Sequence, residues 1–357
     1  MYKHLFLSLI LSAILLVEIP SLDATGFELE EDVSTTLTVS PIGKDDRVPC
    51  DDPRVGRIMP LGCTGWLISS GCVLTAGHCA STPQRRAAMQ WLEFNVPLSA
   101  LNGKPNLAKD EDRYPIVPCT GNREIIWQNN ALGDDWAIFR ISKNLRGESA
   151  FTRQGQFFRL IDNWSFIGLN PIVRVTGYGL DGPPPLYGYN GAEKNERSQT
   201  EQTDSGKLMK EEIIDHKNII SYEVDTLNAN SGSPVYLLGT HLAIGIHTNG
   251  FPPNAEHLNK GTGFKNSSLI NALENYPLPG TKLIYVDADF FAFSAEDGTI
   301  FKPYRRLEDA IDKAKTGATF GIIAGHYAHP GITFPKGKRI TLKALAGNAR
   351  IGSAKYK

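Results

Sequence analysis

The sequence predicts an all-β fold followed by a small C-terminal extension of mixed α and β structure. Between residues 41 and 275, short runs of β-branched and aromatic residues, such as TGWLIS, WAIFRI and LAIGIH, are separated by Gly, Pro, Asn and Asp. Many short strands with turn residues between them are typical of a barrel or sandwich rather than of alternating strands and helices. Helical spacing after an Asn or Ser cap is found in NSSLINALEN, residues 266–275.

The N-terminal residues predict export. Lys3 and His4 precede the apolar run LFLSLILSAILLV, and small residues follow near Ala24. This order is that of a secretory signal peptide, which we predict for residues 1–24. The alternative is an uncleaved membrane anchor, although this run of about 13 residues is shorter than the roughly 20 that span a bilayer. Residues 25–40 are interpreted as a propeptide or linker. We therefore expect a secreted protein, extracellular or periplasmic, without a membrane span.

The charge composition argues against a nucleic-acid partner. The 357 residues include 37 Lys or Arg and 38 Asp or Glu, so the formal net charge is only -1. The last 77 residues differ, because they hold 13 Lys or Arg against 7 Asp or Glu. This basic extension, residues 281–357, is a candidate for binding polysaccharide or a cell surface.

Two further segments have a recognisable pattern. The stretch DGPPPLYGYNGAEKNERSQTEQTDSG, residues 181–206, is polar and rich in Gly and Pro, which predicts a long exposed loop that is either mobile or in contact with substrate. In the extension, YRRLEDAIDKAKTG predicts an amphipathic helix that ends at a glycine, and TFGIIAGHY, GITFP and KRITLKAL predict strands. That order resembles the N-terminal cap and first rungs of a parallel β-helix.

Three polar residues occur in an order that suits nucleophilic catalysis. His78 follows the apolar run VLTA, Asp135 precedes the alternating strand WAIFRI, and Ser231 lies in Asn-Ser-Gly-Ser-Pro. Singly, each also fits a structural role, as a hydrogen-bonding histidine, a turn cap or an ordinary turn. Together they supply a serine hydroxyl, an imidazole that titrates near neutral pH, and a carboxylate to orient it. The sequence therefore favours hydrolysis of an amide through a serine nucleophile.

The segments CTGWLISSGCVLTAGHC, DDWAIFRI, VTGYG and DTLNANSGSPVY, with GIHTNG, resemble trypsin-like serine proteases. They are most similar to the glutamyl endopeptidase branch, which has Ser-Gly-Ser-Pro at the serine, and PIGKDDRVP resembles the mature N-terminus of that branch. The resemblance covers about residues 41–275. It implies two six-stranded Greek-key β-barrels, about 41–150 and 151–275, with the active site between them. It also implies polypeptide substrates, no cofactor, no catalytic metal, and activation by a cut near Ser40 to Ile42.

The resemblance assigns a role to each member of the triad. His78 is the general base and then the acid, Asp135 orients it, and Ser231 forms an acyl-enzyme. Asp134 is the alternative to Asp135, which we prefer because it stands directly before the apolar alternation. Ser233 is the alternative nucleophile, but it precedes Pro234 and so lies in the turn rather than at its apex.

Five cysteines are expected to pair after export, giving two bridges and one odd thiol whose connectivity the sequence does not fix. The resemblance implies a bridge between Cys63 and Cys79 that pins the histidine loop. A second bridge between Cys50 and Cys119 is a hypothesis, and Cys72 would then be the odd thiol. A zinc site is disfavoured because CxxC and HxxxH spacings are both absent.

The resemblance places the oxyanion hole at the backbone N–H groups of Ser231 and Ala229. The family has glycine at the second position. Alanine keeps the N–H, but it costs on the order of 1 kcal/mol if the backbone there requires a positive φ. Loss of one oxyanion donor lowers the rate roughly 10²- to 10³-fold. Two functions therefore stay open, an active endopeptidase and a protease-like binding module with weak or no catalysis.

The walls of the S1 pocket bear on specificity. Thr226 and His247 fall where glutamyl endopeptidases bind the carboxylate of a Glu or Asp at P1, through charge-assisted hydrogen bonds. His247 on its own also fits a buried core histidine. Asp225 falls where trypsin has the carboxylate that attracts Lys or Arg. We expect a preference for acidic P1, with basic P1 through Asp225 as the alternative.

Overall fold

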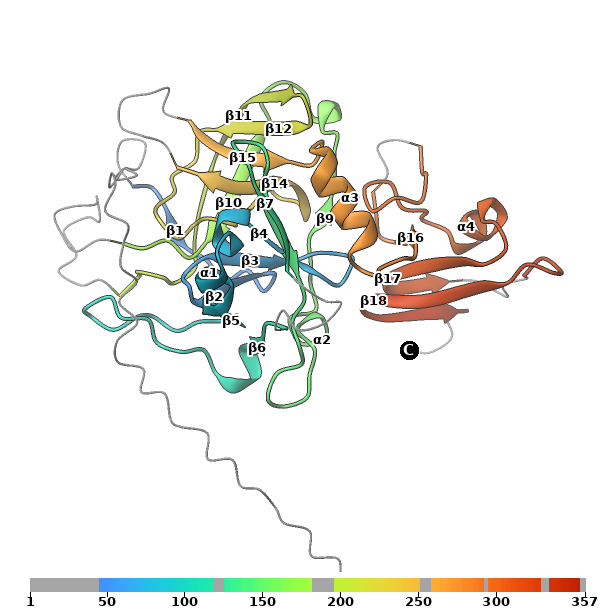
Figure 1. Cartoon of the computed structure of the whole chain (residues 1–357), viewed down its shortest axis with the longest axis horizontal. Helices are drawn as coiled ribbons and strands as arrows, with labels where there is room; N and C mark the ends of the chain where they lie inside the picture. The colour runs from blue at the N-terminus through green and yellow to red at the C-terminus, as the bar shows by residue number, and fades with distance from the viewer. Residues whose placement is uncertain are drawn as a thin grey trace, which may run out of the picture. The chain divides into compact units, whose positions relative to one another are not determined.

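A computed structural model describes residues 45–117, 125–181, 196–250, 258–291, 295–328 and 334–353. Residues Thr38–Lys357 belong to one compact unit. The predicted signal peptide and propeptide, the cut near Ser40 and Cys119 lie outside the described residues. Strands dominate the described part (Figure 1). Its α-helices are α1 (Pro83–Ala88), α2 (Ala150–Gln154), α3 (Ser267–Asn275) and α4 (Leu307–Lys313).

The first half of the chain forms a curled seven-stranded antiparallel sheet, in the order β6-β5-β2-β3-β4-β8-β7. Apolar residues in its short strands pack inward, and the Trp66, Leu92 and Phe139 side chains have no exposed surface. The sheet does not close into a ring within the described residues. Its strands are β2 (Val55–Pro60), β3 (Thr64–Leu67), β4 (Val73–Thr75), β5 (Met89–Glu93), β6 (Arg113–Pro115), β7 (Ile126–Asn129) and β8 (Asp135–Phe139).

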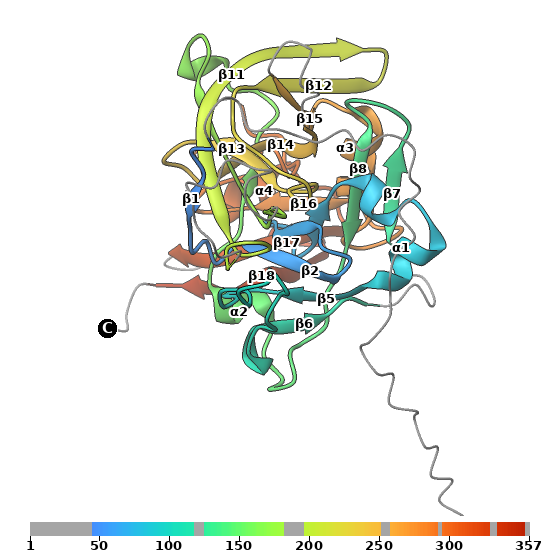
Figure 2. The ribbon, with the colours of Figure 1, turned by 90° about the vertical axis from the view of Figure 1, so that its left-hand side faces the viewer.

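The second half forms an eight-stranded sheet in which six strands close a barrel, because β11 pairs with both β10 and β12. Figure 2 shows β11 and β12 as a long hairpin. Val173, Ile220 and Ile244 fill the barrel. The strands of this sheet are β1 (Val48–Pro49), β9 (Arg159–Leu160), β10 (Ile172–Gly177), β11 (Gln202–Ile214), β12 (Lys217–Tyr222), β13 (Pro234–Leu237), β14 (Leu242–Asn249) and β15 (Asn259–Gly263).

The expected all-β fold is confirmed, as a closed six-stranded barrel and a curled half-barrel sheet, and so is a helix near residues 266–275. Two details differ from expectation. The N-terminal strand β1 crosses over to pair with β11 of the second sheet. The prediction of an exposed loop through residue 206 is wrong at its C-terminal end, because residues 198–203 are buried and β11 already begins at Gln202. Polar composition alone gave the wrong prediction for residues 198–203, because most of their polar side chains have hydrogen-bond partners within the folded protein.

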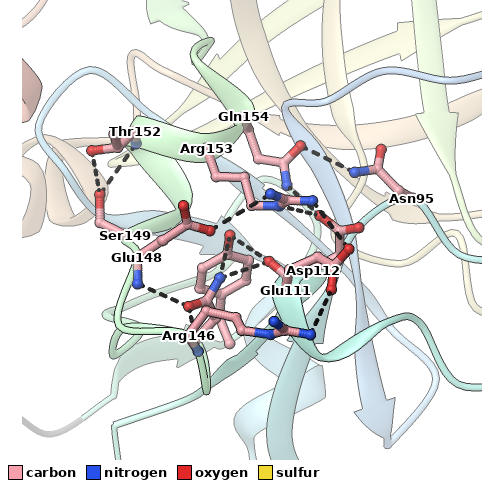
Figure 3. Close-up of polar contacts among 11 residues, drawn as sticks. Asn95, Glu111, Asp112, Arg146, Glu148, Ser149, Thr152, Arg153 and Gln154 are labelled. Atoms are coloured by element: carbon pink, nitrogen blue, oxygen red, sulfur yellow. Dashed lines mark hydrogen bonds and ion pairs between the residues drawn. The ribbon is translucent and has the colours of Figure 1, made fainter.

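A polar cluster fastens α2 to the first sheet (Figure 3). The Ser149 side chain caps the helix by accepting from the Thr152 N–H at 3.1 Å. From the same helix, Arg153 donates to the Asp112 carboxylate at 2.9 Å and Gln154 donates to it at 3.3 Å. Asp112 precedes β6, so these contacts fix the chain segment that connects the two barrels.

The C-terminal extension forms the parallel sheet β16-β17-β18, with α4 packed against it (Figure 1). Its strands are β16 (Leu283–Val286), β17 (Ala318–Ala328) and β18 (Ile340–Gly352), and α4 confirms the predicted helix. Tyr285 and Phe301 belong to the same core cluster as Trp66 of the first sheet. The Arg159 guanidinium also donates two hydrogen bonds to Asp287, at 2.7 and 2.9 Å. The extension therefore shares an apolar core with the first sheet.

Candidate active site

His78 lies in η1, the 3-10 turn Gly77–Ala80 that follows β4. A Cβ atom at Gly77 would lie 1.7 Å from the Gln128 carbonyl oxygen, so only glycine allows β7 to approach this turn. Asp135 begins β8, which pairs with β4. One Asp135 oxygen accepts from the His78 backbone N–H at 2.8 Å, and the other lies 2.7 Å from His78 Nδ1. A side chain so held presents its Nε2 as the ring atom free for chemistry.

Asp134 is engaged elsewhere. Its carboxylate accepts hydrogen bonds from Asn130, Trp136, Asn266 and Ser268, at 2.8 to 3.1 Å. Burial by itself would raise the pKa of Asp134, but these hydrogen bonds outweigh it and lower the pKa below its ordinary value. Asp134 thus ties α3 to the first sheet, and the contact with the histidine belongs to Asp135.

Ser231 stands on a tight turn between the two sheets. The turn is built by Asn230 and Ser233, since the Ser233 N–H donates to the Asn230 carbonyl at 2.9 Å. Gly232 has φ 92°, and a Cβ there would lie 2.2 Å from the Thr64 carbonyl oxygen. Ser231 is half-buried, whereas Ser233 has no exposed surface and is closed to a substrate.

The Ser231 turn also packs directly against the histidine loop. The Thr64 N–H donates to the Ser231 carbonyl at 3.0 Å, and Cys79 Sγ lies 4.0 Å from the same oxygen. Among the described residues, no hydrogen bond of 3.5 Å or less joins the Ser231 hydroxyl to His78. Such bonds are often long in free enzymes and tighten when substrate binds. The three predicted triad residues are therefore brought to one place, with the His78–Asp135 contact formed.

A disulfide joins Cys63 to Cys79, the pair that the resemblance implies. It ties β3 to the turn that carries His78, and thereby limits the movement of the imidazole. Cys50 and Cys72 are free thiols in the structure. The pairing of Cys50 with Cys119 stays a prediction, because Cys119 lies outside the described residues.

Ala229 adopts a left-handed backbone conformation, with φ 71°, which glycine takes up without a steric cost. Its carbonyl accepts from Thr64 Oγ1 at 3.2 Å, which holds the peptide plane in place. Neither the Ala229 nor the Ser231 N–H donates to an acceptor among the described residues. Both proposed oxyanion donors are thus uncommitted, and the cost of alanine is backbone strain rather than a missing N–H.

The predicted S1 walls are buried polar side chains. Thr226 is 2% exposed, and its Oγ1 has no hydrogen-bond partner among the described residues. His247 on β14 is equally buried, and its backbone bonds directly to Gly232 and Ser233. Burial and the neighbouring charge of His78 lower the pKa of His247 to about 3, so the ring is neutral at pH 7.

Asp225 contacts the N-terminal segment. One of its carboxylate oxygens accepts from the Asp46 N–H at 2.9 Å, and its own N–H donates to the Asp204 carboxylate at 2.7 Å. Nearby, Arg47 forms buried ion pairs with Asp45 and Asp181, both at 2.7 Å. The segment at residues 45–47 is therefore docked against the loop that leads to Thr226.

Sequence reasoning missed two residues that support the site. Thr262 on β15 donates to the Asp135 carbonyl at 3.0 Å, and Tyr222 on β12 lies 2.7 Å from His247 Nδ1. Both read as ordinary strand residues, and only the closure of the barrel brings them to these positions. A separate cavity of about 570 Å³ between β7 and α3 contains none of the site residues.

Comparison with known proteins shows the family of this chain. The family model described as trypsin matches residues 53–270, which is more than half of the chain. This chain belongs to the trypsin family. No curated protein matches the sequence. As a member of the family, it has the fold of a trypsin-like serine protease, and the described residues contain no helix long and apolar enough to cross a membrane.

Several solved structures resemble this trypsin-family chain. A Glu endopeptidase in complex with MPD shares 17% identity over 66% of this chain and 96% of its own, with a TM-score of 0.43. The thermostable serine protease AL20 from an extremophilic microorganism shares 14% over 60% and 92%, with a TM-score of 0.37. The HL collagenase shares 14% over 64% and 96%, with a TM-score of 0.43.

Proposed function

We propose that this trypsin-family protein is a secreted serine endopeptidase that cleaves polypeptides after Glu or Asp. The observation that carries the proposal is the contact of both Asp135 oxygens with His78, beside the turn that presents Ser231. His78 Nε2 takes the Ser231 proton as Oγ attacks the scissile carbonyl, and the N–H groups of Ala229 and Ser231 stabilise the oxyanion. His78 then protonates the leaving amine. In deacylation it takes a proton from water as the water oxygen attacks the acyl carbon, and it returns a proton to Ser231 Oγ as the ester bond breaks and the acid product leaves.

The preference for an acidic P1 residue rests on Thr226 and His247. An unpartnered buried hydroxyl costs free energy unless a ligand satisfies it, and a P1 carboxylate supplies the missing acceptor. The alternative of basic P1 requires the Asp225 carboxylate to face the pocket, whereas one of its oxygens is bonded to the Asp46 N–H. These contacts favour the acidic preference.

Secretion is part of the same proposal and rests on the predicted signal peptide and on the disulfide, which suits an oxidising compartment. Binding of polysaccharide or a cell surface by the basic extension stays a prediction. A protease-like binding module is the second candidate, favoured by the strained backbone of Ala229 at φ 71°.

A peptide series that differs only at P1 tests the specificity. The mature protein is expected to cleave after Glu at least 10-fold faster, in kcat/KM, than after Gln or Lys, because a carboxylate offers two charged acceptor oxygens to the two pocket donors, whereas Gln offers one neutral acceptor oxygen and Lys offers none. Ser231→Ala should abolish cleavage of every peptide in the series. A preference for Lys or Arg would contradict the assignment of Thr226 and His247, and cleavage of no peptide by wild type would favour the binding module.

A further inference from the structure

His247 contacts a buried tyrosine, Tyr222, that has no role in the proposed triad. The Tyr222 side chain has no exposed surface, and its hydroxyl oxygen lies 2.7 Å from His247 Nδ1. The two residues stand on β12 and β14, on either side of β15, where Ser221 pairs with Lys260 and His247 with Gly261. Closure of the barrel therefore sets this contact, and every strand involved is part of the second sheet.

The hydrogen bond restricts where the ring proton can be. A neutral imidazole has one N–H, and the nitrogen without it only accepts. The Tyr222 oxygen lies 2.7 Å from Nδ1 but 3.5 Å from its next acceptor, the Lys260 carbonyl oxygen. The tyrosine hydroxyl therefore donates its single proton to Nδ1, the closer acceptor. With Nδ1 accepting that proton, the imidazole hydrogen is on Nε2, which makes no hydrogen bond among the described residues.

We infer that Tyr222 is a positioning residue for substrate specificity: it donates to His247 Nδ1 and thereby keeps a neutral Nε2–H as the donor to the P1 carboxylate. The inference rests on the proposed acidic specificity. Thr226 Oγ1, buried and without a described partner, is the second neutral donor. The pocket thus recognises a negative charge without carrying a positive one, and it avoids an imidazolium next to the catalytic His78.

The surroundings of His247 fit a neutral ring. Among the described residues, the titratable groups that face it are Tyr222 from β12 and His78 from η1, while the Lys260 carbonyl oxygen of β15 lies 3.5 Å from the Tyr222 hydroxyl. From the preceding loop, Asp225 bonds to the Asp46 N–H. No carboxylate among the described residues forms an ion pair with His247 to favour the imidazolium. Burial and the charge of His78 also lower its pKa, in the same direction.

The test compares kcat/KM for two peptides that differ only in Glu or Gln at P1, between pH 6 and 9. Any pH effect on the catalytic step that is common to the two peptides cancels in their ratio. We expect the wild-type ratio to stay constant over this range, because a neutral donor does not titrate. In Tyr222→Phe the ratio should fall about 10-fold, mainly through a higher KM for the Glu peptide, since a buried hydrogen bond that fixes the tautomer is lost.

Tyr236→Phe is the matched control. Tyr236 is also buried, and its hydroxyl lies 3.0 Å from Thr176 Oγ1 in the same barrel but not next to His247. This variant should keep the wild-type ratio. A Tyr222→Phe ratio within twofold of wild type, or a wild-type ratio that falls as pH rises, overturns the inference. If wild type cleaves but shows no preference for Glu over Gln, the proposed specificity fails as well, which is a different result.

A measurement on the wild type alone keeps the inference open to refutation if Tyr222→Phe does not fold. Nitrogen NMR of histidine-labelled protein should show the His247 ring protonated at Nε2 and unprotonated at Nδ1 from pH 6 to 9. The opposite tautomer, or a ring that takes up a second proton within this range, would overturn it.

Discussion

At the residue scale, the most informative position is Ala229. A non-glycine residue at φ 71° costs about 1–2 kcal/mol relative to ordinary backbone, and glycine avoids this at an entropic cost of about 0.5–1 kcal/mol. The same N–H is nonetheless uncommitted and available as an oxyanion donor. In the proposed mechanism, alanine at this position therefore adds backbone strain but keeps the N–H that would serve as the oxyanion donor.

Ala229→Gly is expected to raise the free energy of unfolding by about 0.5–1 kcal/mol, the difference between these two terms. It should leave kcat/KM equal or higher, because the N–H is kept. Urea unfolding and peptide hydrolysis measure the two effects.

Gly232→Ala is the contrasting variant, since its Cβ would lie 2.2 Å from the Thr64 carbonyl oxygen. It should lose both stability and activity. A loss of stability in Ala229→Gly would show that the turn is not strained at this residue.

At the scale of elements, the N-terminal segment is held to the second barrel by a buried carboxyl group. Glu201, just before β11, accepts from the Asp52 N–H at 2.7 Å and from the Tyr178 hydroxyl at 3.3 Å. Its carbonyl also accepts from the Cys50 N–H at 3.2 Å. Burial and the nearby charge of Asp52, opposed in part by the Asp52 N–H bond, raise the pKa of Glu201 to about 8.

This shift predicts a pH-dependent stability. Between the ordinary pKa of 4.5 and about 8, the folded state binds a proton at Glu201 that the unfolded state releases. The Glu201 contribution to the free energy of unfolding should therefore fall as pH rises through this window. Glu201→Gln, which cannot ionise, should remove that part of the dependence in urea titrations at pH 5 and pH 8.

The exposed Glu223 supplies the control, since Glu223→Gln should retain the wild-type pH dependence. If the free energy of unfolding changes equally between pH 5 and pH 8 in wild type and in Glu201→Gln, Glu201 is already ionised in the folded protein.

At the scale of the whole molecule, much could be predicted from the sequence. The strand periodicity and turn residues indicated the all-β class, and the spacing of His78, Asp135 and Ser231 indicated a common site. Whether Asp134 or Asp135 contacts the histidine depends on which carboxylate α3 engages, because Asn266 and Ser268 bind Asp134. The local pattern favoured Asp135, which stands directly before the apolar alternation, but these two partners of Asp134 lie more than 130 residues away and no local pattern contains them.

Other features depend on closure of the second barrel and on docking of distant segments. Tyr222 meets His247 only because β12 and β14 both pair with β15. The extension was set apart by its composition, yet Tyr285 and Phe301 share a core with Trp66. Net charge does not predict such burial, because the apolar residues that become buried are distributed among basic ones.

The central claim is that Ser231, activated by His78, is a working nucleophile. Labelling of the mature, folded protein with a fluorophosphonate probe tests it most directly, because the probe forms a covalent bond only with an activated serine. We predict labelling of wild type at one site, and its loss in Ser231→Ala but not in Ser233→Ala. Wild-type protein that is folded but unlabelled, or labelling that persists in Ser231→Ala, would contradict the claim.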